Sequence, residues 1–74
     1  MWRSNYKIYR AGLAGTIKDL RGRKNLSQER LALMANVDRT LVSKIERGIA
    51  NPTLEILVKI AFCLGVPVSE LLMV

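Results

Sequence analysis

The chain has 74 residues, a mass of 8.3 kDa and a net charge of +6, which limits it to one small domain. Half of its residues are hydrophobic, which excludes an intrinsically disordered chain. With no histidine and a single cysteine, Cys63, it lacks the residues for zinc sites, histidine-dependent catalysis and disulfide frameworks.

These absences also bear on chemistry and location. No nucleophile–base pair or carboxylate cluster is visible, so we expect no enzyme activity, no metal and no cofactor. No apolar run approaches the roughly 20 residues of a transmembrane helix. Basic residues interrupt the first ten positions, so these positions do not form the apolar segment of a signal peptide. A lone thiol is typical of a reducing compartment. We therefore expect a cytoplasmic protein without a membrane partner.

The positive charge is concentrated in the first two thirds of the chain. Residues 1–48 hold eleven of the twelve basic residues and four of the six acidic residues, which leaves +7. Residues 49–74 hold one basic and two acidic residues, which leaves −1. This asymmetry predicts that a polyanion binds to residues 1–48, whereas residues 49–74 form packing surface.

The first ten residues show no clear helical period, so we predict an N-terminal arm over 1–10 and a domain over 11–74. The arm either packs over Leu33 and Met34 or reaches DNA beside the domain. It contains three of the four aromatic residues of the chain: Trp2, Tyr6 and Tyr9.

The rest of the chain reads as five short helices. The apolar periodicity places them at about 13–24, 28–35, 39–47, 54–64 and 70–73. Ser27, Asp38 and Thr53 are candidate N-caps, because their side-chain oxygens can accept a hydrogen bond from a free backbone N–H. Residues that tolerate the left-handed conformation end the first four helices: Asn25, Asn36, Gly48 and Gly65. Connections this short make neighbouring helices pack directly, so the expected fold is an all-α, compact five-helix bundle.

The second and third predicted helices carry the functional signal. A tight turn joins two short helices, which is the spacing of a helix-turn-helix, whose second helix lies in the DNA major groove. The third helix has an inner face of Val42 and Ile45, which would anchor it to the body. Its outer face is small or polar, as groove binding requires: Arg39, Thr40, Ser43, Lys44 and Arg47.

The run LSQERLALMANVDRTLVSKIERGIANPTLEILVKIAFCLGV resembles the Cro/C1-type (XRE-family) helix-turn-helix domain of phage repressors and bacterial regulators. The similarity extends over about residues 13–73. Its markers are in register: Leu26-Ser27-Gln28, Leu31-Ala32, Ser43 to Gly48, Asn51 to Leu54 and Ala61 to Gly65. The segment Asp38-Arg39-Thr40 and the chain length further resemble the controller proteins of restriction–modification systems. The resemblance implies a lambda-repressor-like fold in a bacterial or phage-encoded protein.

The resemblance also implies roles for individual residues. By their positions, Arg39, Thr40 and Lys44 would read base edges. The DNA backbone would be contacted by Gln28, Ser43, Arg47 and Asn51. Arg21 and Glu46 match an internal ion pair that orients the recognition helix.

The C-terminal part predicts a partner surface. Residues 54–64 are apolar on nearly every side, and a helix of this kind is normally buried. Since so small a domain cannot cover it alone, we expect a two-fold homodimer. The interface would contain Phe62, Val66, Val68, Leu71 and Leu72, and Met73 and Val74 would extend it.

Together these features predict a sequence-specific regulator of transcription that binds a palindromic operator in double-stranded DNA as a homodimer. An alternative is an antitoxin-type DNA-binding protein that also holds a partner protein through its apolar C-terminal surface. RNA binding is less favoured, because no aromatic stacking platform lies beside the basic helix.

Overall fold

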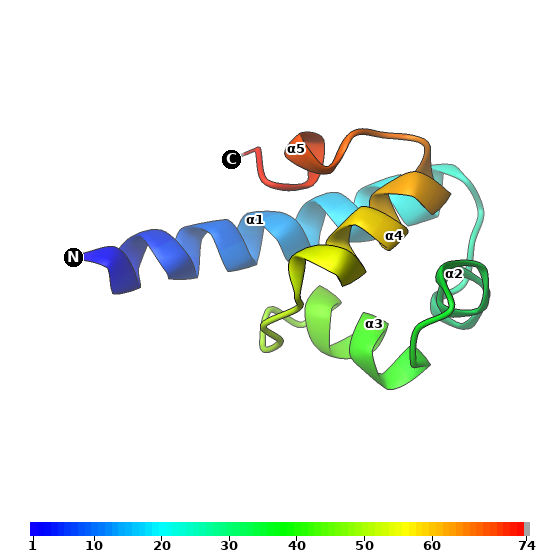
Figure 1. Cartoon of the computed structure of the whole chain (residues 1–74), viewed down its shortest axis with the longest axis horizontal. Helices are drawn as coiled ribbons and strands as arrows, with labels where there is room; N and C mark the ends of the chain where they lie inside the picture. The colour runs from blue at the N-terminus through cyan, green and yellow to red at the C-terminus, as the bar shows by residue number, and fades with distance from the viewer. Residues whose placement is uncertain (74) are drawn as a thin grey trace.

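The computed structural model describes residues 1–73, and these residues form five α-helices and no strand (Figure 1). Val74, which the sequence assigned to the apolar C-terminal surface, lies outside the described residues. The helices are α1 (Trp2–Arg23), α2 (Gln28–Ala35), α3 (Arg39–Glu46), α4 (Leu54–Leu64) and α5 (Val68–Leu71). The all-helical prediction is confirmed.

The N-terminal end differs most from expectation. The predicted irregular arm is wrong, because α1 begins at Trp2 and runs without a break through residues 2–23. Gly15 and Gly22 lie within this helix and face open space, so they add nothing to packing, but they do not interrupt the backbone. The buried side chains of Leu13 and Ile17 hold the middle of the helix in the core, and this packing offsets the low helix propensity.

The predicted contact of this segment with Leu33 and Met34 is also wrong. The N-terminal end of α1 and helix α2 lie at opposite ends of the molecule (Figure 1). Tyr6 and Tyr9 instead line an apolar pocket together with Leu57 and Leu72. Leu33 and Met34 remain exposed on α2.

Capping fixes the start of the three middle helices as predicted. Ser27 accepts a hydrogen bond from the Arg30 N–H at 2.9 Å, and Thr53 accepts one from Ile56 at 3.2 Å. Asp38 accepts one from the Thr40 N–H at 3.0 Å. Helices α2 and α4 have the bounds that the sequence predicted, α3 ends at Glu46 rather than Arg47, and α5 begins at Val68 rather than Glu70. Left-handed residues follow the first four helices, at Asn25, Asn36, Gly48 and Gly65.

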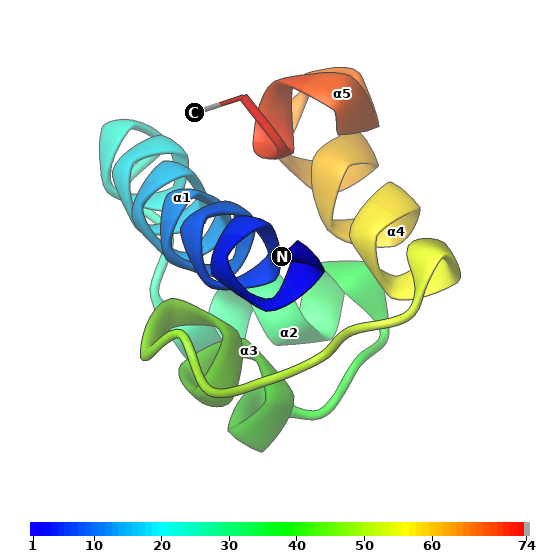
Figure 2. The same ribbon diagram turned by 90° about the vertical axis from the view of Figure 1, so that its left-hand side faces the viewer.

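Every helix contributes to one core. Figure 2 looks along α1 from its N-terminal end, with α2 and α3 below it and α4 and α5 across from it. The largest fully buried side chains are Ile17, Leu31, Val42, Ile45, Ile60, Leu64 and Leu71. Leu71 was predicted at a dimer interface, and that assignment is wrong because α5 starts early enough to turn this side chain into the core of its own chain. No helix among residues 1–73 is long and apolar enough to cross a membrane.

Candidate nucleic-acid interface

Helix α3 lies at the lower edge of the molecule (Figure 1), and its exposed side chains are polar. Val42 and Ile45 are buried, so the helix is anchored from inside. Arg39, Thr40 and Lys44, the predicted base-reading residues, are exposed. The helix therefore offers side chains of the kind that bind base edges on a support held by the core.

A shallow hollow joins α3 to the start of α2. Gln28, Arg39, Thr40 and Ser43 line it, and its volume is about 210 Å³. The structure thus brings together two predicted base readers and two predicted backbone-contact residues, from two helices. Arg47 is exposed at the C-terminal end of α3.

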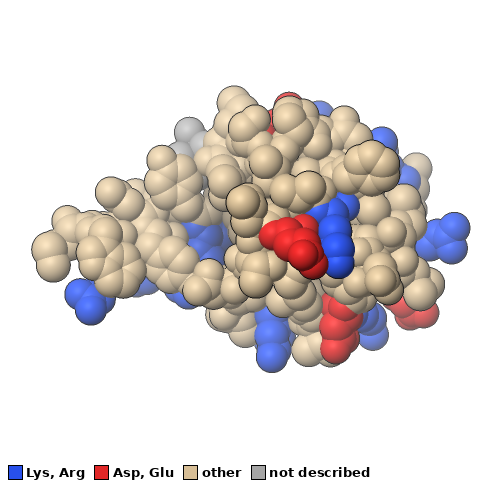
Figure 3. All heavy atoms as spheres, in the orientation of Figure 1, with Lys and Arg blue, Asp and Glu red and all other residues tan. Residues whose placement is uncertain are grey.

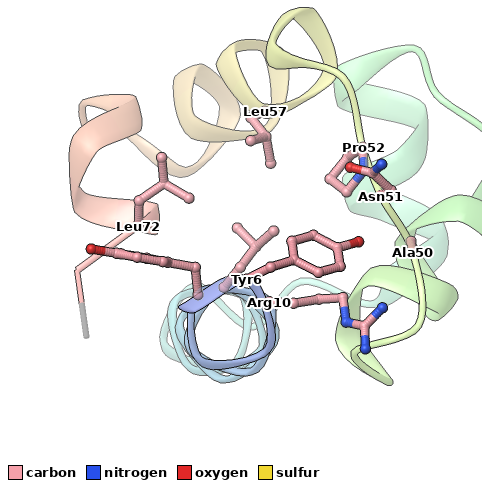
Figure 4. A pocket seen from close by; sticks show the side chains of 9 residues that line it. Tyr6, Arg10, Ala50, Asn51, Pro52, Leu57 and Leu72 are labelled. Carbon is pink, nitrogen blue, oxygen red and sulfur yellow. The ribbon is translucent and has the colours of Figure 1, made fainter. Parts of the chain in front are cut away.

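Asn51 lies apart from this hollow, in the loop between α3 and α4. It lines the apolar pocket of about 140 Å³ beneath α1, beside Arg10 and Pro52. Figure 4 shows the Tyr6 ring pointing from α1 toward this loop, with Leu57 and Leu72 across the pocket. The α1 helix therefore supports the loop that carries Asn51.

An ion pair fixes the far end of α3. Arg21 of α1 donates two hydrogen bonds to Glu46, from Nε to Oε2 at 2.6 Å and from Nη2 to Oε1 at 2.9 Å. The remaining Arg21 nitrogen, Nη1, donates to the Leu26 carbonyl at 2.7 Å. Gln28 Nε2 also donates to Glu46 Oε1, at 3.0 Å. One carboxylate therefore ties α1 and α2 to the recognition helix, as the resemblance implied for Arg21 and Glu46.

Residues 17–71, most of the chain, match the helix-turn-helix family HTH_3. The chain belongs to this helix-turn-helix family. Its members are DNA-binding regulators of transcription rather than enzymes. The match confirms the resemblance to XRE-type domains.

Related helix-turn-helix proteins include control proteins. C.MunI of Mycoplasma sp. is 46% identical over 56 residues, which cover 74% of this chain and 76% of C.MunI. C.BamHI of Bacillus amyloliquefaciens is 44% identical over 50 residues, which cover 68% of this chain but only 62% of C.BamHI. Among solved structures, the restriction-modification controller protein C.AhdI from Aeromonas hydrophila has a TM-score of 0.81 and 35% identity, and the match covers 84% of this chain and 94% of that chain. The predicted similarity to controller proteins is thereby confirmed.

In this helix-turn-helix protein the pKa values of both members of the Arg21–Glu46 ion pair are shifted. Burial raises the pKa of the Glu46 carboxyl and is the largest single influence. The hydrogen bonds from Arg21 and Gln28 and the charges of Arg21 and Lys18 together outweigh it, so the pKa of Glu46 lies below its usual range. The hydrogen bond to Glu46 raises the pKa of Arg21. Both groups are therefore ionised at neutral pH.

Acidification should weaken this contact. An unfolded Glu takes up a proton near pH 4.3, whereas folded Glu46 does so at a lower pH. Between these values the unfolded state binds more protons, so stability falls as the pH decreases. We expect the melting temperature of the natural chain to exceed that of Glu46→Gln at pH 7, and the difference to shrink below about pH 4.

Glu55→Gln is the control for this experiment. Glu55 forms only an exposed ion pair with Lys59, at 3.3 Å, so its loss should produce little change at any pH. If the difference in melting temperature between the natural chain and Glu46→Gln stays constant from pH 7 to pH 3, the assigned role of the Glu46 carboxylate is contradicted.

Gln28 has a contact that the sequence did not predict. We expected its side chain to contact the DNA backbone, and the structure shows it half-buried and bonded to Glu46. A side-chain amide nitrogen has two N–H donors, so one remains for a phosphate oxygen. The sequence did contain a signal for this bond. Glu46 falls on the inner, buried side of its helix, and a buried carboxylate needs more than one donor.

Proposed function

We propose that this protein regulates transcription by binding a roughly palindromic operator in double-stranded DNA as a homodimer. The observation that carries the proposal is the outer face of α3, which is polar and exposed while its inner face is locked in the core. Similarity to control proteins supports a role as a controller of restriction–modification genes. The antitoxin alternative receives no support from these relatives.

The proposed base readers lie at the start and middle of α3. Arg39 is exposed in the first turn, where an Arg can bind guanine O6 and N7 with two hydrogen bonds. Thr40 is exposed beside it and can place its methyl group against thymine. Lys44, one turn later, is exposed on the same side of the helix and can donate to guanine.

The proposed backbone contacts surround these readers. Gln28 and Ser43 line the same hollow as Arg39, and Arg47 and Asn51 follow at the end of α3 and in the next loop. Contacts of this kind set the register of the protein on DNA and carry no sequence information. Base readers flanked by phosphate contacts are the arrangement that docks one helix in a major groove.

The proposed dimer surface lies on α4. Leu54, Val58 and Phe62 follow one another at intervals of four residues, so they form one stripe, and they are 67%, 49% and 84% exposed. Figure 3 shows this face as largely uncharged, apart from one adjacent acidic and basic pair. Of the residues predicted for the interface, Val66 and Val68 are half-buried and Leu72 is exposed. An apolar stripe of this kind is normally covered, and a two-fold contact sets it against its own copy.

Selection of bound sites from random duplexes tests this function. The natural chain should enrich two inverted half-sites about 10 bp apart, the spacing of one helical turn. Arg39→Ala should lose about 1–3 kcal/mol on the enriched site and tolerate more bases at one position of each half-site.

Arg23→Ala is the matched control. Arg23 is an exposed cation of α1 that pairs with Asp19, so its loss should leave the enriched sequence intact. If Arg39→Ala enriches the same sites with the same preferences as the natural chain, the base-reading role of Arg39 is wrong. If the natural chain enriches no sequence, the proposed function is wrong.

A further inference from the structure

The N-terminal end of α1 projects beyond the other helices (Figure 1). The helix has 22 residues, which span roughly 33 Å at 1.5 Å per residue, and the longest extent of the molecule is 36 Å. Its first two turns make no part of the buried core, because every residue of the segment 1–9 is exposed. The proposed function gives no role to this projecting segment, residues 2–10.

The projecting segment has two different faces. Tyr6 and Tyr9 lie on the side of the apolar pocket. Arg3, Lys7 and Arg10 follow one another at intervals of four and three residues, which places them on an adjoining face of the helix, and Arg10 also lines the pocket. In Figure 3 the basic groups of this projection lie mainly along its lower side, and its front is uncharged.

The phase of the helix shows where the basic face points. Arg3 precedes Arg21 by eighteen residues, or five turns of about 3.6 residues, so the two side chains leave the helix in the same direction. Arg21 points to α3, where it bonds to Glu46. Arg3 therefore points to the same side of the molecule as α3, but about 27 Å farther along α1 at 1.5 Å per residue.

The cations of this face are also available. Arg3, Lys7 and Arg10 line one shallow hollow together with Trp2, Ser4 and Tyr6, and no carboxylate lines it. The Arg3 guanidinium lies 4.9 Å from the centre of the Trp2 ring, and the Arg10 guanidinium lies 4.9 Å from that of Tyr6. Stacking on a ring orients a guanidinium while its N–H groups stay free for an anion.

We propose that the basic face of residues 2–10 binds the phosphate backbone of DNA adjoining the half-site that α3 reads. The aromatic face fixes the projection to the body, and the basic face extends the contact beyond the helix-turn-helix. This inference rests on the proposed function, because the duplex must be held by α3 for the projection to meet it. Phosphate contacts here add affinity without adding base preference.

The salt dependence of binding tests the proposal. In the full chain, Arg3→Gln combined with Lys7→Gln removes two exposed cations and keeps good helix formers. In a homodimer the variant lacks two phosphate contacts in each copy, so the slope of log K against log salt on the selected operator should become shallower by about 3.6, since each contact contributes about 0.9. The natural chain should then lose about 150-fold more affinity than the variant between 50 and 200 mM salt. The enriched sequence should not change.

The control variant has the same net charge. Arg23→Gln combined with Lys59→Gln also removes two cations, the exposed Arg23 and the half-buried Lys59, each of which pairs with a carboxylate on its own helix away from the basic face. Its salt slope should equal that of the natural chain. An unchanged slope for the Arg3 and Lys7 variant, or an equal change for both variants, would overturn the proposed contact. Failure of the natural chain to prefer the selected operator would instead overturn the proposed function.

Discussion

Replacing Arg21 by Met should lower the free energy of unfolding by about 3–5 kcal/mol, because it leaves the buried Glu46 carboxylate without its charged partner. The side chains of the pair are only 19% and 2% exposed, so solvent screens the charge of Glu46 little. Gln28 would remain as a single neutral donor to Glu46. Since a domain of this length is stabilised by only about 4–11 kcal/mol, the loss is a large part of the total.

Two further variants separate the buried pair from an ordinary ion pair. Arg23→Met removes a contact to Asp19 whose side chains are 73% and 58% exposed, and it should cost less than about 1 kcal/mol. Combining Arg21→Met with Glu46→Leu should recover most of the loss, because it removes the unpaired charge as well. Chemical denaturation measures all three. Equal costs for Arg21→Met and Arg23→Met would show that Glu46 does not depend on Arg21.

Replacing Phe62 by Asp should convert the proposed dimer to a monomer and lower operator affinity by at least 100-fold. Phe62 is the most exposed side chain of the α4 stripe, so a charge at this position is harmless in an isolated chain. In a two-fold contact the same substitution buries two like charges against apolar surface, which opposes association. Loss of the second half-site then removes the gain from bivalent binding.

Sedimentation at tens of micromolar measures the oligomeric state, and melting shows that the fold is retained. Leu33→Asp is the matched control, because Leu33 is equally apolar and 67% exposed, but lies on α2 away from the stripe. It should leave the dimer intact. A natural chain that sediments as a monomer, or a Phe62→Asp variant that remains dimeric, would contradict the proposed interface.

Local signals in the sequence were sufficient for the central part of the fold. The bounds of α2 and α4 follow from Ser27, Thr53, Asn36 and Gly65, because caps and left-handed stops act over a few residues. The outer face of α3 follows from its apolar anchors in the same way. These elements depend little on distant contacts, so the sequence alone was enough to predict the bounds of α2 and α4 and the outer face of α3.

Features that depend on distant contacts could not be predicted in this way. The first two turns of α1 are an exception, because their signal is local and was missed: Trp2, Tyr6 and Tyr9 recur at i, i+4 and i+7, the helical spacing that Leu13 and Ile17 continue. Leu71 was expected at the surface, and only the path of the chain after Gly65 turns it inward. The bond from Gln28 to Glu46 joins residues eighteen positions apart, beyond the reach of local pattern.

The network around Glu46 has a consequence for how the protein would search DNA. Arg21, itself bonded to the Leu26 carbonyl, and Gln28 hold the end of α3 before any duplex is present, so the reading surface is preorganised. Association then requires little ordering of the chain, so little entropy is lost on binding. A rigid α3 can meet many DNA sequences in a single conformation. Discrimination among these sequences then rests on base contacts instead of refolding at each site.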